Sequence, residues 1–325
     1  MNKIVCFGEA LIDFLAEPTQ GREVAQSYLR NAGGAPANVA VAVAKLGGDA
    51  AFVGMLSQDA FGDFLLDSLA DAGVDISYTV RTGLANTALA FVSLNEQGER
   101  SFSFYRPPAA DLLFRKEHFS DACFSGTYAF HVCSNSMTEA EIAGVTLAGM
   151  QRARDAGVLV SFDMNLRLPL WHADVDPAPL LWQALHAADL VKLSADELAY
   201  LAADAGGEKY ALERIWHGSA RLLIVTHGAD AIRWHTREFD GSADVFSTHV
   251  VDTTAAGDAF VGGLLTCLAE QGVRADHLPE FARSGTLHGA LRFAAACGAI
   301  AVTRHGAFAA MPTRRDLEPL LGVSA

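Results

Sequence analysis

Short apolar runs alternate with longer helical patterns along most of this chain of 325 residues. The alternation predicts a parallel β-sheet covered by helices, because each helix carries the chain back to the edge where the next parallel strand begins. We expect strands of that sheet at residues 3–8, 51–54, 128–133, 158–163, 190–193 and 221–226. The fold class is therefore predicted to be α/β.

Several helix ends are marked in the sequence. Thr138 and Glu141 form a capping box, and Gly157 predicts the end of the helix that they begin. Residues 257–271 and 281–301 predict two long helices whose many small residues would allow close packing.

Two pairs of strand-like segments interrupt the alternation, and they lie at residues 12–16 with 24–29 and at residues 88–94 with 101–105. The second pair flanks a hairpin signal at residues 95–98. A small sheet beside a ligand crevice would serve as a lid. We therefore expect one domain, residues 1–325, into which lid segments at about 12–32 and 86–107 are inserted.

The net charge of −14 and the isoelectric point near 5.1 argue against a nucleic-acid partner or an anionic membrane surface. Five cysteines without a CxxC pair indicate reduced thiols rather than a disulfide frame. The first strand follows the N-terminus without a signal-peptide pattern, and no apolar run reaches the ~18 residues of a membrane span. A cytoplasmic location is expected.

The P-loop and dinucleotide glycine patterns are absent from the sequence, so phosphate binding would need another device. Residues 252–260, DTTAAGDAF, place small residues before a long helix, whose first N–H groups and dipole favour an anion. Asp258 in the first turn could accept the proton of an attacking hydroxyl. Alternatively, it is an acidic residue that only complements the helix dipole.

Two further candidates lie near the N-terminus. Residues 33–40, GGAPANVA, allow close backbone approach to a ligand, and Asn38 offers a donor and an acceptor to vicinal hydroxyls. Asp13 follows the first strand at the sheet edge where α/β proteins bind ligands. The structural alternatives are a capping role for Asn38 and a solvated carboxylate for Asp13.

Taken together, GEALID, then GGAPANVAVAVAKLGG with Gly62, then DTTAAGDAF resemble the ribokinase (PfkB-type) family of sugar kinases over residues 4–313. The first loop, SFYRPPAAD at 103–111 and DMNLRLPLW at 163–171 are similar to fructokinases of that family. The resemblance implies a three-layer α/β/α fold with a mostly parallel central sheet and a small β lid. It also implies a homodimer joined through the lid.

The resemblance assigns roles residue by residue. Sugar binding is implied for Asp13, Gly33, Gly34, Asn38, Phe104, Arg106, Asn165, Arg167 and Asp258. Catalysis is implied for Asp258 as base, with Ala255, Ala256, Gly257 and Arg167 at the transferred phosphoryl group. Nucleotide binding is implied for Lys192, Ser194, Glu197, Thr226, Gly228, Ala256 and Gly257.

Structural alternatives exist for several of these residues. Arg106 could be a solvated charge at a hairpin end, and Arg167 could pair with Asp163. Ser194 and Glu197 also form a capping box. The pair of Thr226 and Gly228 could be a turn that only ends a strand.

The implied cofactors are ATP, Mg²⁺ and K⁺. Glu197 would hold Mg²⁺ through water. The K⁺ site would consist of Asp252 and the carbonyls of Thr254, Ala301, Gly306 and Ala310. Three residues depart from the family pattern: Ala231 replaces a Gly in the nucleotide loop, Ala295 replaces an Asn near the adenine, and Ala255 replaces a Gly in the anion hole. If position 255 needs a positive φ, alanine costs about 1 kcal/mol there.

The predicted reaction is transfer of the γ-phosphoryl group of Mg-ATP to the 6-hydroxyl of D-fructose. A 2-keto-3-deoxygluconate kinase is the alternative enzyme, since Arg106 and Arg167 would suit a substrate carboxylate. A non-catalytic sugar-binding regulator is the alternative outside enzymes, and Ala255 is the feature that favours it.

Overall fold

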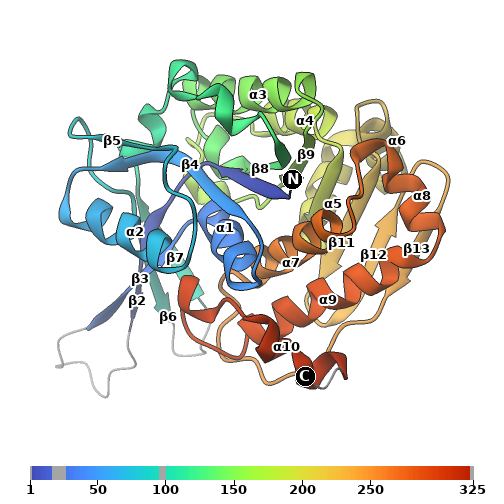
Figure 1. Cartoon of the computed structure of the whole chain (residues 1–325). Coiled ribbons are helices and arrows are strands. Elements are labelled where there is room, and N and C mark those ends of the chain that lie inside the picture. The colour runs from blue at the N-terminus through green and yellow to red at the C-terminus, as the bar shows by residue number, and fades with distance from the viewer. Residues whose placement is uncertain (1, 17–26, 95–99, 323–325) are drawn as a thin grey trace.

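A large twisted sheet forms the centre of the molecule (Figure 1). The computed structural model describes residues 2–16, 27–94 and 100–322. In this part of the chain the sheet has nine strands in the order β13-β12-β11-β10-β9-β8-β1-β4-β5. They are β1 (Lys3–Phe7), β4 (Ala50–Ser57), β5 (Thr79–Thr82), β8 (Thr127–Cys133), β9 (Leu159–Asp163), β10 (Leu190–Ser194), β11 (Leu222–His227), β12 (Asp230–His235) and β13 (Asp240–Ala243). The neighbours from β11 to β5 pair in parallel, whereas β12 and β13 pair antiparallel at one edge.

Helices cover both faces of this sheet, and the side-chain alternation of β1 shows why. Ile4 and Cys6 pack into one apolar cluster, whereas Val5 and Phe7 pack into the other. The first cluster takes in α1 (Ala35–Lys45), α2 (Ala60–Asp71), α7 (Ala256–Glu270), α8 (Leu278–Arg283), α9 (Thr286–Ala301) and α10 (Arg314–Leu321). The second takes in α3 (Ala140–Asp155), α4 (Ala178–Ala187), α5 (Ala195–Ala205) and α6 (Glu208–Trp216). The expected α/β/α fold is confirmed.

Helix α7 lies between α1 and α9 and packs closely on both. A Cβ atom at Gly262 would lie 2.5 Å from the Cβ of Ala42 in α1, and one at Gly263 would lie 2.7 Å from Sγ of Cys297 in α9. The predicted close packing of small-residue helices is therefore present, and it fixes α7 without large side chains.

The second sheet consists of β2 (Leu11–Ala16), β3 (Tyr28–Gly33), β6 (Leu89–Leu94) and β7 (Arg100–Tyr105), in the order β3-β2-β6-β7. It projects from one end of the large sheet (Figure 1). The Phe14 and Phe91 rings stack at 5.0 Å on one of its faces, where Phe14 also meets Phe61 of α2. We call it the small sheet.

Some local predictions were wrong. Helix α3 begins at Ala140 without a capping box, because the Thr138 hydroxyl accepts a hydrogen bond from Arg106 instead. The helix expected over 281–301 is two helices, α8 and α9, which are separated at residues 284–285. Strand β3 runs from Tyr28 to Gly33, and residues 24–26 of the expected strand, like the hairpin signal at 95–98, are outside the described residues.

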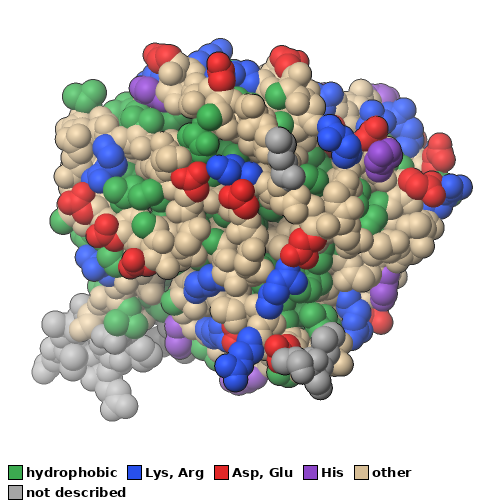
Figure 2. Space-filling model, in the orientation of Figure 1, with side chains coloured by type: hydrophobic (Ala, Val, Ile, Leu, Met, Phe, Trp, Pro, Cys, Tyr) green, Lys and Arg blue, Asp and Glu red, His purple; other side chains and the backbone are tan. Residues whose placement is uncertain are grey.

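Basic and acidic side chains are interspersed on the face shown in Figure 2 and form no broad basic patch there. A phosphate group approaching this face meets a mixed field, so phosphate binding depends on local donors. Within the described ranges, no helix is long and apolar enough to cross a membrane.

Candidate active site

Asp258 is the centre of the candidate site. It lies in the first turn of α7 and its side chain is almost fully buried. Asn38 of α1 donates from Nδ2 to Asp258 Oδ2 at 2.7 Å, and Asn165, after β9, donates to Oδ1 at 3.4 Å. Burial raises the pKa of the Asp258 carboxyl, while Asn38, Lys192 and Arg167 act to lower it. Asp258 is thus a stronger base than an exposed aspartate, and its orientation is fixed.

The N-terminus of α7 provides an anion site beside this base. Ala255 is its N-cap residue and has left-handed backbone angles, φ 58° and ψ 11°. The N–H groups of Gly257 and Asp258 belong to the first turn, where no acceptor exists within the helix. A Cβ on Gly257 would lie 3.1 Å from Nζ of Lys192, so an ammonium group is next to these N–H groups.

Lys192 and Glu197 lie at the carboxyl end of β10. The Lys192 ammonium pairs with Asp163 at 3.1 Å, so Asp163 is engaged by this lysine rather than by Arg167. Burial acts to lower the pKa of Lys192, but the negative charges of Asp163 and Glu197 act to raise it and have the larger combined effect, so the pKa is raised. The lysine therefore stays charged at neutral pH.

Glu197 holds the turn between β10 and α5 in place. Its Oε2 accepts from the Ser194 N–H at 2.7 Å and its N–H donates to Ser194 Oγ, so the predicted capping box is present. Its Oε1 accepts from the N–H of Leu166 at 2.8 Å, which ties down the loop that carries Asn165 and Arg167. A water ligand of Mg²⁺ could use the remaining lone pairs of these oxygens.

Asp13 comes from the small sheet and faces the same space. Its carboxylate lies against Gly33, where a Cβ atom would come within 2.1 Å of Oδ2, so only glycine fits there. Burial and the negative charges of Asp258 and Asp252 raise the pKa of Asp13 to about 7. Asp13 keeps partial exposure to solvent, and its role in sugar binding stays a prediction.

Strand register places four residues in one row across the small sheet. Asp13 pairs with Asn31 and with Ala90, and Ala90 pairs with Phe104. Paired residues on neighbouring strands share a face, so Phe104 and Asp13 lie on the same face. The sequence analysis had not singled out Asn31.

A cavity of about 520 Å³ opens on the other side of α7's N-terminus. Four predicted nucleotide residues line it: Thr226, Gly228, Ala256 and Gly257. Ala295 also lines it, together with apolar residues that the motifs did not indicate, among them Val245, Phe246 and Phe260. A volume of this size and an apolar wall suit a nucleotide base.

The loop before α7 is organised by Asp252. Its buried carboxylate accepts from the Thr254 N–H at 2.7 Å and from the Gly306 N–H at 3.2 Å. Two of the predicted cation-binding segments are therefore brought together by one carboxylate. The Ala301 carbonyl accepts from the N–H of Arg304 at 3.2 Å, and Ala310 ends a short 3₁₀ turn. Among the described residues, no group of three or more His, Cys, Asp and Glu side chains could hold a metal ion.

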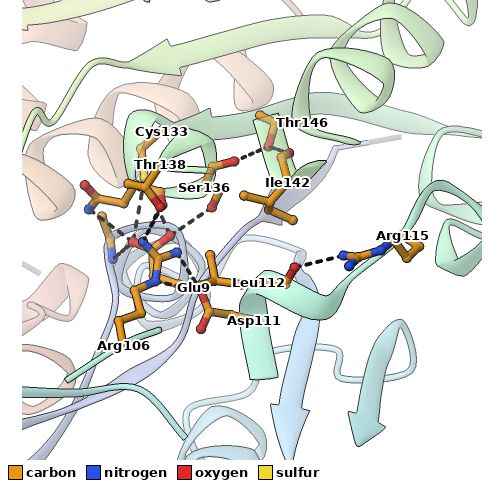
Figure 3. A network of polar contacts seen from close by, with 12 residues as sticks. Glu9, Arg106, Asp111, Leu112, Arg115, Cys133, Ser136, Thr138, Ile142 and Thr146 are labelled. Atoms are coloured by element: carbon orange, nitrogen blue, oxygen red, sulfur yellow. Dashed lines mark hydrogen bonds and ion pairs between the residues drawn. The ribbon is translucent and has the colours of Figure 1, made fainter. Parts of the chain in front are cut away.

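Arg106 lies in a buried network of polar contacts. It is only 2% exposed, so the alternative of a solvated hairpin-end charge is wrong. Its Nε and Nη2 donate to Asp111 at 2.9 and 2.5 Å, and its Nη1 donates to the Asn135 carbonyl and to Thr138 Oγ1 (Figure 3). Protein groups engage all three of its nitrogens. A direct contact of Arg106 with the sugar stays a prediction.

Asn165 and Arg167 follow β9. Asn165 is buried and has a φ of 39°, and its amide reaches Asp258. Arg167 is exposed, and its Nη1 donates to the Leu166 carbonyl at 3.2 Å. Its positive charge acts to lower the pKa of Asp258, and its place at the transferred phosphoryl group stays a prediction.

Glu9 is a buried acidic residue of this region to which the sequence analysis gave no role. It follows β1 within the GEALID motif and is 1% exposed. Its partners lie 26 to 127 residues away in the sequence, so no local pattern could reveal them.

A base beside an anion-binding helix end and a nucleotide-sized cavity is what phosphoryl transfer to a hydroxyl group requires, so the fold and the site define a kinase. The sequence pattern of the pfkB family carbohydrate kinases matches residues 1–314. The chain belongs to this family, and the expected membership is confirmed.

Individual relatives extend the comparison. Fructokinase-2 of Oryza sativa subsp. japonica is 41% identical over 100% of this chain and 95% of its own. A fructokinase from Xylella fastidiosa, solved with bound ATP, is 54% identical, with a TM-score of 0.94 over 99% of this chain and 98% of that one. A fructokinase variant from Vibrio cholerae, solved with fructose, ADP and potassium ion, is 33% identical, with a TM-score of 0.86 over 99% and 98% of the two chains.

Proposed function

We propose that this carbohydrate kinase transfers the γ-phosphoryl group of ATP to the 6-hydroxyl of D-fructose. The observation that carries the proposal is the place of Asp258, between the Asp13 carboxylate and the cavity at the N-terminus of α7. A sugar held by Asp13 and Asn38 would present a hydroxyl to Asp258. The choice of fructose is supported by relatives at 41% and 54% identity that are named fructokinases.

In this mechanism Asp258 accepts the proton of the 6-hydroxyl as the oxygen attacks the γ-phosphorus. Burial, which raises the pKa of Asp258, makes the carboxylate a better acceptor for that proton. The Asn38 amide keeps Oδ2 oriented. An in-line approach then needs only that sugar and nucleotide occupy the two sides of the α7 N-terminus.

The developing charge on the transferred group would be stabilised by the first-turn N–H groups of α7 and by Lys192. These donors are fixed before the reaction, so they need no reorganisation in the transition state. Mg²⁺ bound with the nucleotide would supply further positive charge at the β- and γ-phosphates. Glu197 would hold a water molecule of that ion.

A monovalent cation, K⁺, would bind at the loop before α7. The support is a buried carboxylate, Asp252, that already joins the segments at Thr254 and Gly306. Backbone carbonyls and one carboxylate are the hard oxygen ligands that such a cation prefers. Its binding would stiffen the segment that ends at the anion site.

The two alternatives have less support. A sugar acid would need a cationic clamp, but Arg106 is already paired with Asp111, which leaves only Arg167 for a substrate carboxylate. A non-catalytic regulator was suggested by Ala255. Ala255 adopts the left-handed conformation that a glycine would adopt there. Its Cβ atom therefore does not prevent the N-terminus of α7 from forming, and Ala255 no longer favours a non-catalytic role.

The experiment is a coupled ADP-release assay over fructose, other hexoses, 2-keto-3-deoxygluconate and a riboside, with ³¹P and ¹³C NMR of the product. We expect the highest kcat/KM with fructose and a phosphate ester at its C6. The matched control is Asp258→Asn, which keeps the shape of the side chain but cannot accept the proton. A sugar acid as best substrate, or fructose binding by calorimetry without ADP release, would refute the proposal.

We also propose that two copies of the chain associate through the small sheet. Leu29, on the same face of this sheet as Asp13, is 50% exposed, and Tyr28 and Tyr105, on the opposite face, are 38% and 67% exposed. Both faces therefore leave apolar surface that a second sheet could cover. Light scattering after gel filtration should give twice the mass of the chain, and Tyr105→Ser should shift the equilibrium toward monomer. A wild-type protein that stays monomeric at assay and higher concentrations would contradict this.

A further inference from the structure

Glu9 is buried at the carboxyl end of β1, where three segments meet (Figure 3). Its Oε1 accepts from the N–H of Ala35, at 3.2 Å, and from Nδ2 of Asn135, also at 3.2 Å. Its Oε2 accepts from Oγ of Ser136 at 2.9 Å. One carboxyl group therefore joins the end of β1 to the start of α1 and to the segment after β8.

The partners of Glu9 show which atom of its carboxyl group accepts hydrogen bonds. The Ala35 N–H and the Asn135 amide nitrogen can only donate, so Oε1 of Glu9 accepts from both. Burial raises the pKa of Glu9, and the positive charge of Arg106 opposes this shift. Arg106 also pairs with Asp111, so one buried guanidinium compensates two carboxylates.

The contact with Ala35 connects Glu9 to the reacting groups. Ala35 is the first residue of α1, and a negative charge is favourable at that end of a helix. Asn38, one turn further along α1, makes the 2.7 Å hydrogen bond to Asp258. Because an α-helix is stiff over one turn, a displacement of Ala35 moves the Asn38 amide with it.

We propose that Glu9 is a positioning residue: it holds the first turn of α1 so that Asn38 keeps Asp258 oriented for proton transfer. Arg106, the residue that follows strand β7 of the small sheet, supplies the countercharge. Glu9 therefore acts through Asn38 and does not touch the sugar. The inference rests on the proposed kinase reaction but not on which sugar is used.

The test is Glu9→Gln, which keeps the size of the side chain, removes the negative charge near the start of α1 and puts an NH₂ group in place of one acceptor oxygen. We expect kcat to fall by about 10- to 100-fold, as small misplacements of reacting groups do. The KM for ATP should stay within about twofold, since the cavity for the nucleotide is on the other side of α7. The acid limb of the kcat pH profile should move to higher pH, because Asp258 loses a hydrogen bond that favours its charged form.

A second variant removes only the link to α1. Ala35→Pro deletes the N–H that donates to Glu9, at a first helical position where proline is well tolerated. Ala35→Pro should also move the acid limb of the kcat pH profile to higher pH. This variant tests the positioning role even if Glu9→Gln does not fold. An acid limb at the wild-type pH in Ala35→Pro would overturn the proposal.

Two comparisons separate positioning from general disruption. In an Asn38→Ala background, Glu9→Gln should have little further effect on kcat, because the path through Asn38 is already broken. Asp111→Asn perturbs the same buried cluster without contacting α1, so it should lower Tm without moving the acid limb. Equal effects of Glu9→Gln in both backgrounds, or an acid limb moved equally by Asp111→Asn, would refute the role.

All variants are compared with wild type on the sugar that wild type phosphorylates best. Absence of fructose turnover by wild type therefore counts against the proposed function alone. Unchanged kinetics of Glu9→Gln on an active sugar count against the positioning role alone.

Discussion

Ala255 gives the sharpest test of backbone strain in this fold. Its φ of 58° at the N-cap of α7 lies in the left-handed region of backbone conformations. An L-residue with a Cβ atom loses about 1–2 kcal/mol in that region, whereas glycine does not. Glycine also has more conformational freedom in the unfolded chain, and this lowers the free energy of unfolding by about 0.4–1 kcal/mol. Ala255→Gly should therefore raise the free energy of unfolding by about 0.5–1 kcal/mol.

The matched control is the next residue, Ala256→Gly. Ala256 begins the regular helix, where glycine costs about 0.5–1 kcal/mol relative to alanine. The two neighbouring substitutions should thus change stability in opposite directions. For 325 residues the unfolding entropy is about 0.7 kcal/mol per kelvin, so each change moves Tm by about 1 °C.

Differential scanning calorimetry of the three proteins in one buffer resolves such a difference. A Tm for Ala255→Gly at or below that of Ala256→Gly would show that position 255 is not strained. The kcat of Ala255→Gly should equal or exceed that of wild type, because the N–H groups of α7 keep their direction. A large loss of activity would show that the Cβ atom has a role in the anion site.

Three further predictions concern charge. First, replacing K⁺ by a bulky organic cation should lower kcat, because the loop before α7 then loses the ion proposed to stiffen it; equal rates in both buffers would exclude the cation site. Second, burial and nearby negative charges raise the pKa of Asp13 to about 7 in the folded protein. Between about pH 4 and 7 the folded state therefore holds a proton that the unfolded chain releases. The free energy of unfolding should fall as the pH rises through this window. Asp13→Asn should therefore gain Tm over wild type progressively from pH 5 to 8 while it weakens fructose binding, and a constant difference in Tm would contradict the shift. Third, Arg106→Gln leaves two buried carboxylates without a cation and should lower the free energy of unfolding by about 3–5 kcal/mol, measured by calorimetry; a neutral effect would mean that the cluster binds a proton instead.

The sequence predicted the central strands well because their signal is local. Strands such as β8 and β9 are mostly apolar runs with buried side chains on both faces. The strands β12 and β13 at one edge and β5 at the other were missed, since they are partly exposed and mix polar with apolar residues.

In the candidate site, prediction succeeded where one motif carries one role. Asp258 and Asn38 each lie in a recognisable stretch, and the fold brings them to 2.7 Å. Glu9 and Arg106 were not understood from sequence because their environment is made by distant segments. Thr138 shows the same limit, since a long-range hydrogen bond from Arg106 replaced the expected local cap.

The helices α1, α7 and α9 approach closely at small residues, because Gly262 of α7 lies against Ala42 of α1 and Gly263 lies against Ala294 and Cys297 of α9. The helix that carries the base therefore has almost no freedom to shift, and enlarging Gly262 or Gly263 would displace it by steric force. The small sheet, in contrast, supplies Asp13 and Phe104 from strands beyond this junction. A side chain of the small sheet such as Phe104 can thus be exchanged without changing the packing of the three helices.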